Sequence, residues 1–395
     1  MRVLSEEEWR PRLEAHEERA QQRLDTFRHP GGYHPVYDFL FEYYPVRPSH
    51  LRRWHPGIGS ALEAGAPHRE WRDYRVTVDG LTVIDLPAFW ERRGQSLLYI
   101  RELMARTALN PATFDCFGLH EWAMVYKTDR PRHDLPLRLG AAGTDAVVES
   151  HRIKCTHFDA YRFFTEPARP LNLTVLTRDT QPATDQAGCV HATMDLYKWA
   201  WKLGPLVPGE VFLDALDLAI EARTLDMEAS PYDCRELGFG VVAIETAEGK
   251  AEYVHRQRAL ADKAKPLRDR LVALVDAAAA AQLLAYFVPG KVAHGASLQW
   301  KELLRSRPVA HRGARGNRSR SGGGSHLVLR PRWRGGYHRG PRLELCGVVH
   351  LTGGIHTDHG GERRFRDADE YVECPADTDE RGGAQQRGIG KRRRS

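Results

Sequence analysis

The apolar residues in the second half of the chain limit its fold most, because they recur with the period of an α-helix. The segment from Pro208 to Ala229 shows this pattern most clearly. A longer and highly charged segment, from Gly249 to about Ala280, repeats it with its leucines on one side. Segments of this length and period favour a domain built mainly from packed helices.

Two further helices and one hairpin complete the expected fold. The charged segment from Ser5 to Arg28 carries a sparse apolar stripe, and another helix should begin at Pro87. The sequence from Tyr74 to Leu86 partly alternates around Asp79-Gly80, a strong two-residue hairpin signal. Val241 to Glu245 is expected to be a short strand. We therefore predict a mainly α fold, of the α+β type, in which a helical domain carries a small β-hairpin.

The character of the chain changes near residue 285. Residues 1–285 are expected to form one helical domain, whereas residues 286–395 are dominated by Arg, Gly and His without an apolar period, which is typical of disorder. This tail could be an Arg/Gly-rich arm that binds nucleic acid. It could also be non-native sequence from out-of-frame translation, which the abrupt change in pattern favours.

Composition sets broad limits on function. The net charge of +6 permits a polyanionic partner without demonstrating one. No stretch reaches the roughly 18 apolar residues that a membrane span needs, so no membrane association is expected. The charged N-terminal segment lacks the apolar core of a signal peptide, and the six cysteines are too few for a disulfide framework. A cytoplasmic protein with reduced thiols is therefore predicted.

The stretch from His151 to Trp201 concentrates the residue types that form sites. It contains two Cys-x-His pairs, Cys155/His157 and Cys189/His191. Together they could supply a Cys2His2 zinc site, although the spacing within each pair is tighter than usual. The alternative is structural: the thiols are buried as small apolar groups and the histidines bond locally. No other cofactor is expected.

Each pair is followed by a carboxylate among aromatic residues. Asp159 can be a general base whose pKa is raised by an apolar setting, or it can close a capping box with Thr156. Asp195 lies three residues before Lys198, so the two can form a surface ion pair. Alternatively Asp195 lies in a cleft with Lys198 as a cation or amine nucleophile.

Two other motifs have competing explanations. His120 and Glu121 are adjacent in an apolar segment and cannot both face the core of a helix, so one is expected to face a cavity. HPGIG at His55–Gly59 is similar to the hairpin of helix-hairpin-helix DNA-binding proteins, in which glycines let backbone amides approach a phosphate. A plain Pro-Gly turn explains the same residues and is favoured, because too few residues follow for a second helix.

Several long motifs resemble a bacterial family catalogued as 3-methyladenine DNA glycosylase. They include HPVYDFLFEYYPVRPSHLRRWHPG, CFGLHEWAMVYK, CTHFDAYRFFT, GCVHATMDLYKWAWKLGPLVPGE and LDMEASPYD, and the resemblance covers about Val3 to Val275. It implies a DNA-repair hydrolase that excises alkylated bases from double-stranded DNA. Such an enzyme needs an aromatic pocket for the flipped, cationic base and a carboxylate that positions water.

The chain contains residues of the types that such chemistry needs. The candidate pocket residues are Trp122, Tyr126, Phe158, Tyr161, Tyr197 and Trp199, with Asp159 or Asp195 as the base and His120 or Glu121 as further catalytic candidates. The candidate phosphate-binding residues are Arg47, Arg52, Arg53 and Arg152. Two alternatives remain open: a metal-dependent or other hydrolase centred on the Cys-His stretch, and a protein that binds a small aromatic ligand without catalysis.

Overall fold

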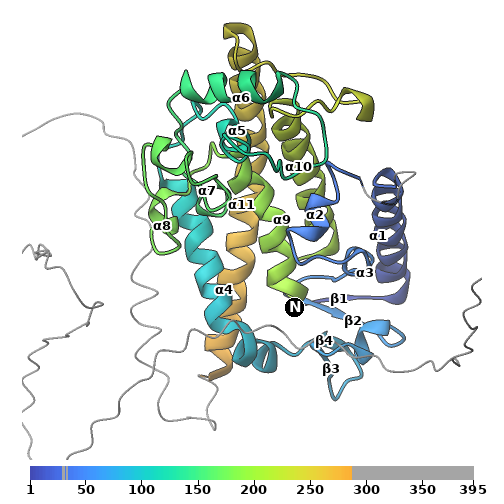
Figure 1. Cartoon of the computed structure of the whole chain (residues 1–395). Coiled ribbons are helices and arrows are strands. Elements are labelled where there is room, and N and C mark those ends of the chain that lie inside the picture. The colour runs from blue at the N-terminus through green and yellow to red at the C-terminus, as the bar shows by residue number, and fades with distance from the viewer. Residues whose placement is uncertain (29–31, 33, 287–395) are drawn as a thin grey trace, which may run out of the picture. The chain divides into compact units, whose positions relative to one another are not determined.

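The computed structural model describes residues 1–28, 32 and 34–286, all of which belong to one compact unit within Met1–Val309. The described chain is mainly helical with a small sheet, as the apolar periodicity predicts (Figure 1). None of the helices in these ranges is long and apolar enough to cross a bilayer. The Arg/Gly-rich tail lies outside the described residues.

One helix occupies the centre of the unit. Helix α9 (Val190–Leu203) packs against α10 (Gly209–Glu228), α11 (Ala247–Tyr286) and α4 (Leu86–Leu109) (Figure 1). It ends at Gly204, whose positive φ of 57° suits a residue without a Cβ. Every residue of α9 from its start to Lys198 is buried. Its polar side chains must therefore find partners inside the protein.

The sheet lies at one end of the helical body (Figure 1). Its strands are β1 (Arg2–Leu4), β2 (Ser60–Leu62), β3 (Tyr74–Val76) and β4 (Thr82–Ile84), in the order β1-β2-β4-β3. Strands β3 and β4 pair antiparallel and form the predicted hairpin, with Gly80 at φ 79° in the turn. Strand β1 pairs parallel with β2.

The remaining elements are mostly short. Helix α1 (Glu6–Thr26) confirms the predicted N-terminal helix and packs on α10. The other helices are α2 (Phe39–Glu42), α3 (Pro48–Leu51), α5 (Leu119–Ala123), α6 (Gly140–Glu149), α7 (Phe158–Tyr161) and α8 (Gln181–Thr184), with 3-10 turns at Pro67–Glu70, Arg169–Leu171, Gly204–Leu206 and Arg235–Leu237.

Two expectations are settled by local packing. The predicted strand at Val241–Glu245 is wrong: this segment is irregular, and its last residue instead forms a bidentate ion pair with Arg138, with N–O distances of 2.6 and 2.9 Å. In HPGIG, a Cβ on Gly57 would lie 2.6 Å from Pro208, which explains the glycine by its packing. Strand β2 follows this motif where a helix-hairpin-helix needs its second helix, so the turn is the correct interpretation.

Candidate functional site

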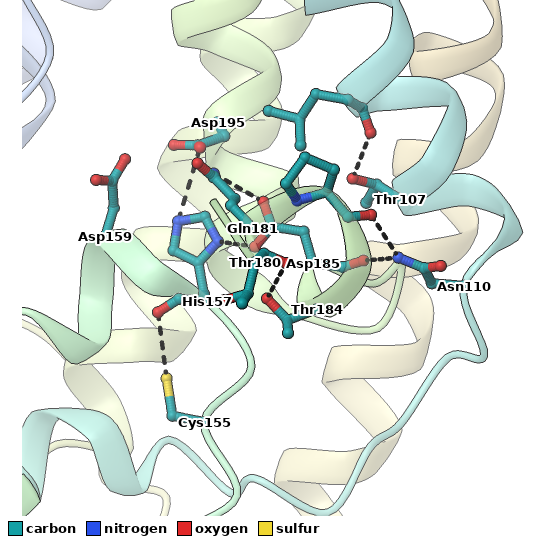
Figure 2. A network of polar contacts seen from close by, with 12 residues as sticks. Thr107, Asn110, Cys155, His157, Asp159, Thr180, Gln181, Thr184, Asp185 and Asp195 are labelled. Carbon is teal, nitrogen blue, oxygen red and sulfur yellow. Dashed lines mark hydrogen bonds and ion pairs between the residues drawn. The ribbon is translucent and has the colours of Figure 1, made fainter. Parts of the chain in front are cut away.

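Two segments far apart in the sequence meet at the central helix. The loop that carries Cys155 and His157 is held by Asn172, whose side-chain oxygen accepts from the Cys155 amide at 2.8 Å. The Asn172 amide group also donates to the Cys155 carbonyl at 3.1 Å. The buried Asn172 side chain thus satisfies both backbone groups of Cys155. This clamp fixes the loop so that the imidazole of His157 faces α9 (Figure 2).

An outer cluster is formed by Asp159, Asp185, Asp195, His157 and Lys198. The Lys198 ammonium donates to Asp195 at 2.7 Å and to Asp159 at 3.3 Å, so it joins the two carboxylates that the sequence singled out. The predicted ion pair between Asp195 and Lys198 is present, but the prediction that it lies at the surface is wrong. Both side chains are buried because α9 is packed on all sides.

His157 lies between two carboxylates of this cluster. Its Nδ1 is 3.1 Å from Asp185 and its Nε2 is 3.7 Å from Asp195 (Figure 2). The Gln181 amide donates to the other oxygen of Asp185 at 2.9 Å. Burial lowers the pKa of His157, but the two carboxylates outweigh this and raise it to about 9. The imidazole is therefore protonated at neutral pH.

Asp159 is the outermost carboxylate of the cluster. Its side chain is 10% exposed, compared with 3% for Asp195. Burial raises the pKa of Asp159, but Lys198, His157 and Arg162 together hold it below its usual value. The capping box predicted with Thr156 is not formed, because α7 begins after His157 and the Asp159 carboxylate turns to Lys198. Asp159 is thus an ionised group within reach of the surface.

The protonated His157 predicts a pH dependence of stability. The folded state holds this proton up to about pH 9, whereas the unfolded state releases it near 6.5. The stabilisation is therefore complete below pH 6.5 and should be lost as the pH rises through about 9. The wild type and His157→Gln should be compared by urea denaturation. The difference between their unfolding free energies should become smaller as the pH rises from about 6.5 to about 9.

His68 supplies the control for this measurement. It is also buried, but burial lowers its pKa to about 4, so it is neutral throughout the range. The gap in unfolding free energy between wild type and His68→Gln should stay constant from about pH 7.5, above the unfolded pKa, to about pH 10. A constant gap for His157→Gln as well would contradict a charged imidazole at that position.

An inner cluster joins α5 to α9 and α10 through His120, Glu121, His191, Arg223 and Asp226. The Arg223 guanidinium donates to Asp226 at 2.9 Å and to Glu121 at 3.0 Å. His120 Nε2 lies 2.8 Å from the other oxygen of Asp226. The expectation that only one of His120 and Glu121 could face the interior is wrong, because all five residues of the short helix α5 are buried.

A row of three imidazoles connects the two clusters. The rings of His157 and His191 stack with centroids 5.3 Å apart, and the rings of His191 and His120 meet edge to face at 4.3 Å. Burial and the neighbouring His120 lower the pKa of His191 well below its usual value. A charged and a neutral imidazole therefore lie side by side within the core.

A small cavity lies beside this row. It has a volume of about 10 Å³, which is room for one water molecule. His120, His191 and the three cysteines Cys116, Cys155 and Cys189 contribute to its lining. Burial raises the pKa of all three thiols, that of Cys155 to about 12. The cysteines are therefore protonated, and the Cys155 thiol donates to the carbonyl of His157 at 3.5 Å.

Two groups of side chains in the described ranges could hold a metal ion. One consists of His120, His191 and Asp226 and the other of His157, Asp159 and Asp195, with the ligand atoms of each group within 4.8 Å of one another. The four residues expected as one Cys2His2 site do not form such a group. Their histidines divide between the two clusters, and carboxylates take the place of the cysteines.

The other sequence candidates are distributed unevenly. Phe158 and Trp199 lie at the outer cluster, with cationic groups 5.3 and 4.2 Å above their rings. The remaining predicted pocket residues are buried within the core, namely Trp122, Tyr126, Tyr161 and Tyr197. The predicted phosphate-binding residues Arg47, Arg52, Arg53 and Arg152 are exposed. Within the described chain, none of these four makes a hydrogen bond or ion pair with the outer cluster.

Several site residues were missed in the sequence. Tyr44 donates to Asp195 at 3.0 Å, and Asp185 holds His157, but neither stands in a pattern that indicates it. Arg223 and Asp226 could have been found, because two opposite charges three residues apart continue the apolar face that Leu216 and Ala219 begin, which suggests a buried pair.

No family model matches this sequence, and neither a curated protein nor a solved structure is significantly similar to it. The resemblance to a glycosylase family thus stays a prediction. What the site can do follows from its own residues: an ionised carboxylate near the surface, a buried ammonium and a charged imidazole behind it.

Proposed function

We propose that this protein is a hydrolase that removes cationic, alkylated bases from double-stranded DNA, with Asp159 as the carboxylate that positions and activates water. The contact of Lys198 with both Asp159 and Asp195 carries the proposal. Asp159 and Asp195 lie 36 residues apart, in two of the motifs that resemble the glycosylase family. Their shared contact with Lys198 makes them members of one charged cluster. The outermost member of that cluster is ionised and reaches the surface.

The main requirement of the proposed reaction is one carboxylate positioned next to the attacking water. Water adds to the sugar carbon while the bond from this carbon to the base nitrogen breaks. The electron pair of that bond returns to the base and neutralises its positive charge, and a proton of the water passes to Asp159. The carboxylate also stabilises the positive charge that develops on the sugar. Lys198 keeps Asp159 ionised, and Asp195, which also contacts His157, fixes the ammonium in place.

The surroundings of Asp159 suit such a substrate. Phe158 adjoins Asp159 in the sequence, and Arg162, which pairs with Asp159, lies over the rings of Tyr43 and Phe163. Aromatic faces attract a flipped cationic base. Arg162 and Arg178 each place a nitrogen 3.7 Å from Asp159 and are about half exposed, so they can also contact phosphates. These two arginines replace the predicted phosphate-binding residues in the proposal. We also propose a cytoplasmic location, because the described cysteines are free thiols.

Release of bases from alkylated duplex DNA tests this function. Asp159→Asn keeps the shape of the side chain but removes its charge, so base release should fall by about 100-fold or more. The matched control is Asp217→Asn on α10, which also removes a carboxylate paired with two arginines, Arg19 and Arg23. That variant should keep most of its activity. A folded wild-type protein that releases no base, or an Asp159→Asn variant as active as the control, would rule out the proposal.

A further inference from the structure

The inner cluster contains an arrangement of ligands that the proposed hydrolysis does not use. His120, His191 and Asp226 come from α5, α9 and α10, and their ligand atoms lie within 4.8 Å of one another. Two imidazole nitrogens and one carboxylate oxygen are a common three-residue set for a divalent transition metal. All three side chains are buried, so a bound ion would be shielded from water.

His191 is the residue that a purely structural explanation leaves unaccounted for. It is only 7% exposed, and within the described chain its ring makes no hydrogen bond, only ring contacts with His120 and His157. A largely buried imidazole that bonds no protein group needs another partner, such as water or a metal ion. His191 lines the cavity that has room for one water molecule, and so does His120. A metal ion bound here would be coordinated by the lone pair of a ring nitrogen of His191. The cavity could hold a fourth ligand of the ion.

The outer group of possible ligands is different, because its centre is already filled. The Lys198 ammonium lies 2.7 Å from Asp195 and 3.3 Å from Asp159, where a cation shared by the two carboxylates would lie. Among the residues that the structure describes, no lysine pairs with Asp226 in this way. Arg223 bonds only the oxygen of Asp226 that faces away from His120, and this contact orients the carboxylate as outer partners of metal ligands do.

We propose that His120, His191 and Asp226 bind one divalent metal ion of borderline softness, Zn²⁺ before others, which ties α5, α9 and α10 together. In binding, the ion takes the place of the proton between His120 and Asp226. The nitrogen and oxygen ligands and the neighbouring thiols of Cys116, Cys155 and Cys189 suit Zn²⁺ better than Mg²⁺ or Ca²⁺. This site does not depend on the proposed hydrolysis, since it shares no residue with the outer cluster.

Equilibrium dialysis of the full-length, metal-stripped chain against Zn²⁺ tests the site, with the bound metal measured by mass spectrometry. The wild type should retain about one ion per chain. Zn²⁺ should also raise its Tm, because the ion binds only the folded state. His191→Gln should weaken binding by more than about 100-fold, because even the loss of an outer partner of a metal ligand costs about 10- to 100-fold. His120→Gln is the second variant, in case the first does not fold.

His157→Gln is the matched control, because it removes the neighbouring imidazole of the row but no proposed ligand. It should bind Zn²⁺ at least as tightly as the wild type does, because it also removes a positive charge beside His191. Loss of the ion in His157→Gln, with retention in His191→Gln, would assign the metal to other residues and overturn the proposal. A folded wild type that retains no ion and shows no change in Tm with Zn²⁺ would also overturn the proposal. Base release is not measured here, so this test and that of the hydrolysis succeed or fail separately.

Discussion

Replacement of Arg223 by Met should lower the free energy of unfolding by about 3–5 kcal/mol. Arg223 is fully buried and bonds two carboxylates, Glu121 and Asp226. Methionine fills much of the same space but leaves both carboxylates without their cation. An uncompensated buried charge is among the most destabilising changes in a protein. Denaturant unfolding followed by circular dichroism measures the difference.

Arg19→Met is the control for this prediction. Arg19 also pairs with two carboxylates of α10, Asp214 and Asp217, but its side chain is 33% exposed. Water can replace it there, so the loss should stay below about 1 kcal/mol. If the two variants lost similar stability, burial would not be what makes the Arg223 pairs important.

Replacement of Lys198 by Met should have a comparable effect, of about 3–5 kcal/mol at neutral pH. The substitution leaves Asp159 and Asp195 close together without their shared ammonium. The pKa of Asp159 in the folded variant should rise, because the Lys198 ammonium that holds it down is gone. The difference in unfolding free energy between wild type and variant should become smaller as the pH falls toward the range in which carboxylates titrate. Protonation of a carboxylate then relieves the repulsion in the variant.

Lys263→Met serves as the reference for Lys198→Met. Lys263 pairs with Glu221 at the surface, where both side chains are about half exposed, and its removal should cost less than about 1 kcal/mol. A gap for Lys198→Met that stays constant with pH would mean that lost packing, and not unpaired charge, explains the effect.

The sequence predicts the elements of this fold better than the site they build. The helical class and the β3–β4 hairpin follow from local patterns, namely apolar periodicity and Asp79-Gly80. The contact between Asp195 and Lys198 also follows from helical spacing. Its burial does not, because it depends on three other helices that cover α9. No local rule indicates which segments will pack there.

The same limit explains the residues that were missed or misassigned. Tyr44 reaches Asp195 from 151 positions away, so only the tertiary structure brings them together. Thr156 and Asp159 have the spacing of a capping box, but the nearby Lys198 ammonium offers Asp159 a charged partner and prevails over the local bond. The two Cys-x-His pairs suggest one zinc site by their composition, whereas the structure groups His191 with His120 and Asp226, and His157 with Asp159 and Asp195.

The stacked rings of His157 and His191 link the outer cluster to the inner cluster electrostatically. The charge on His157 is one of the causes that lower the pKa of His191, so a change of charge at one ring affects the other. A cation bound at His191 and Asp226 should therefore lower the pKa of His157, and a cationic substrate beside Asp159 should act on both rings in the same direction. Such communication requires no hinge or moving segment, only imidazoles in contact in a medium of low polarity.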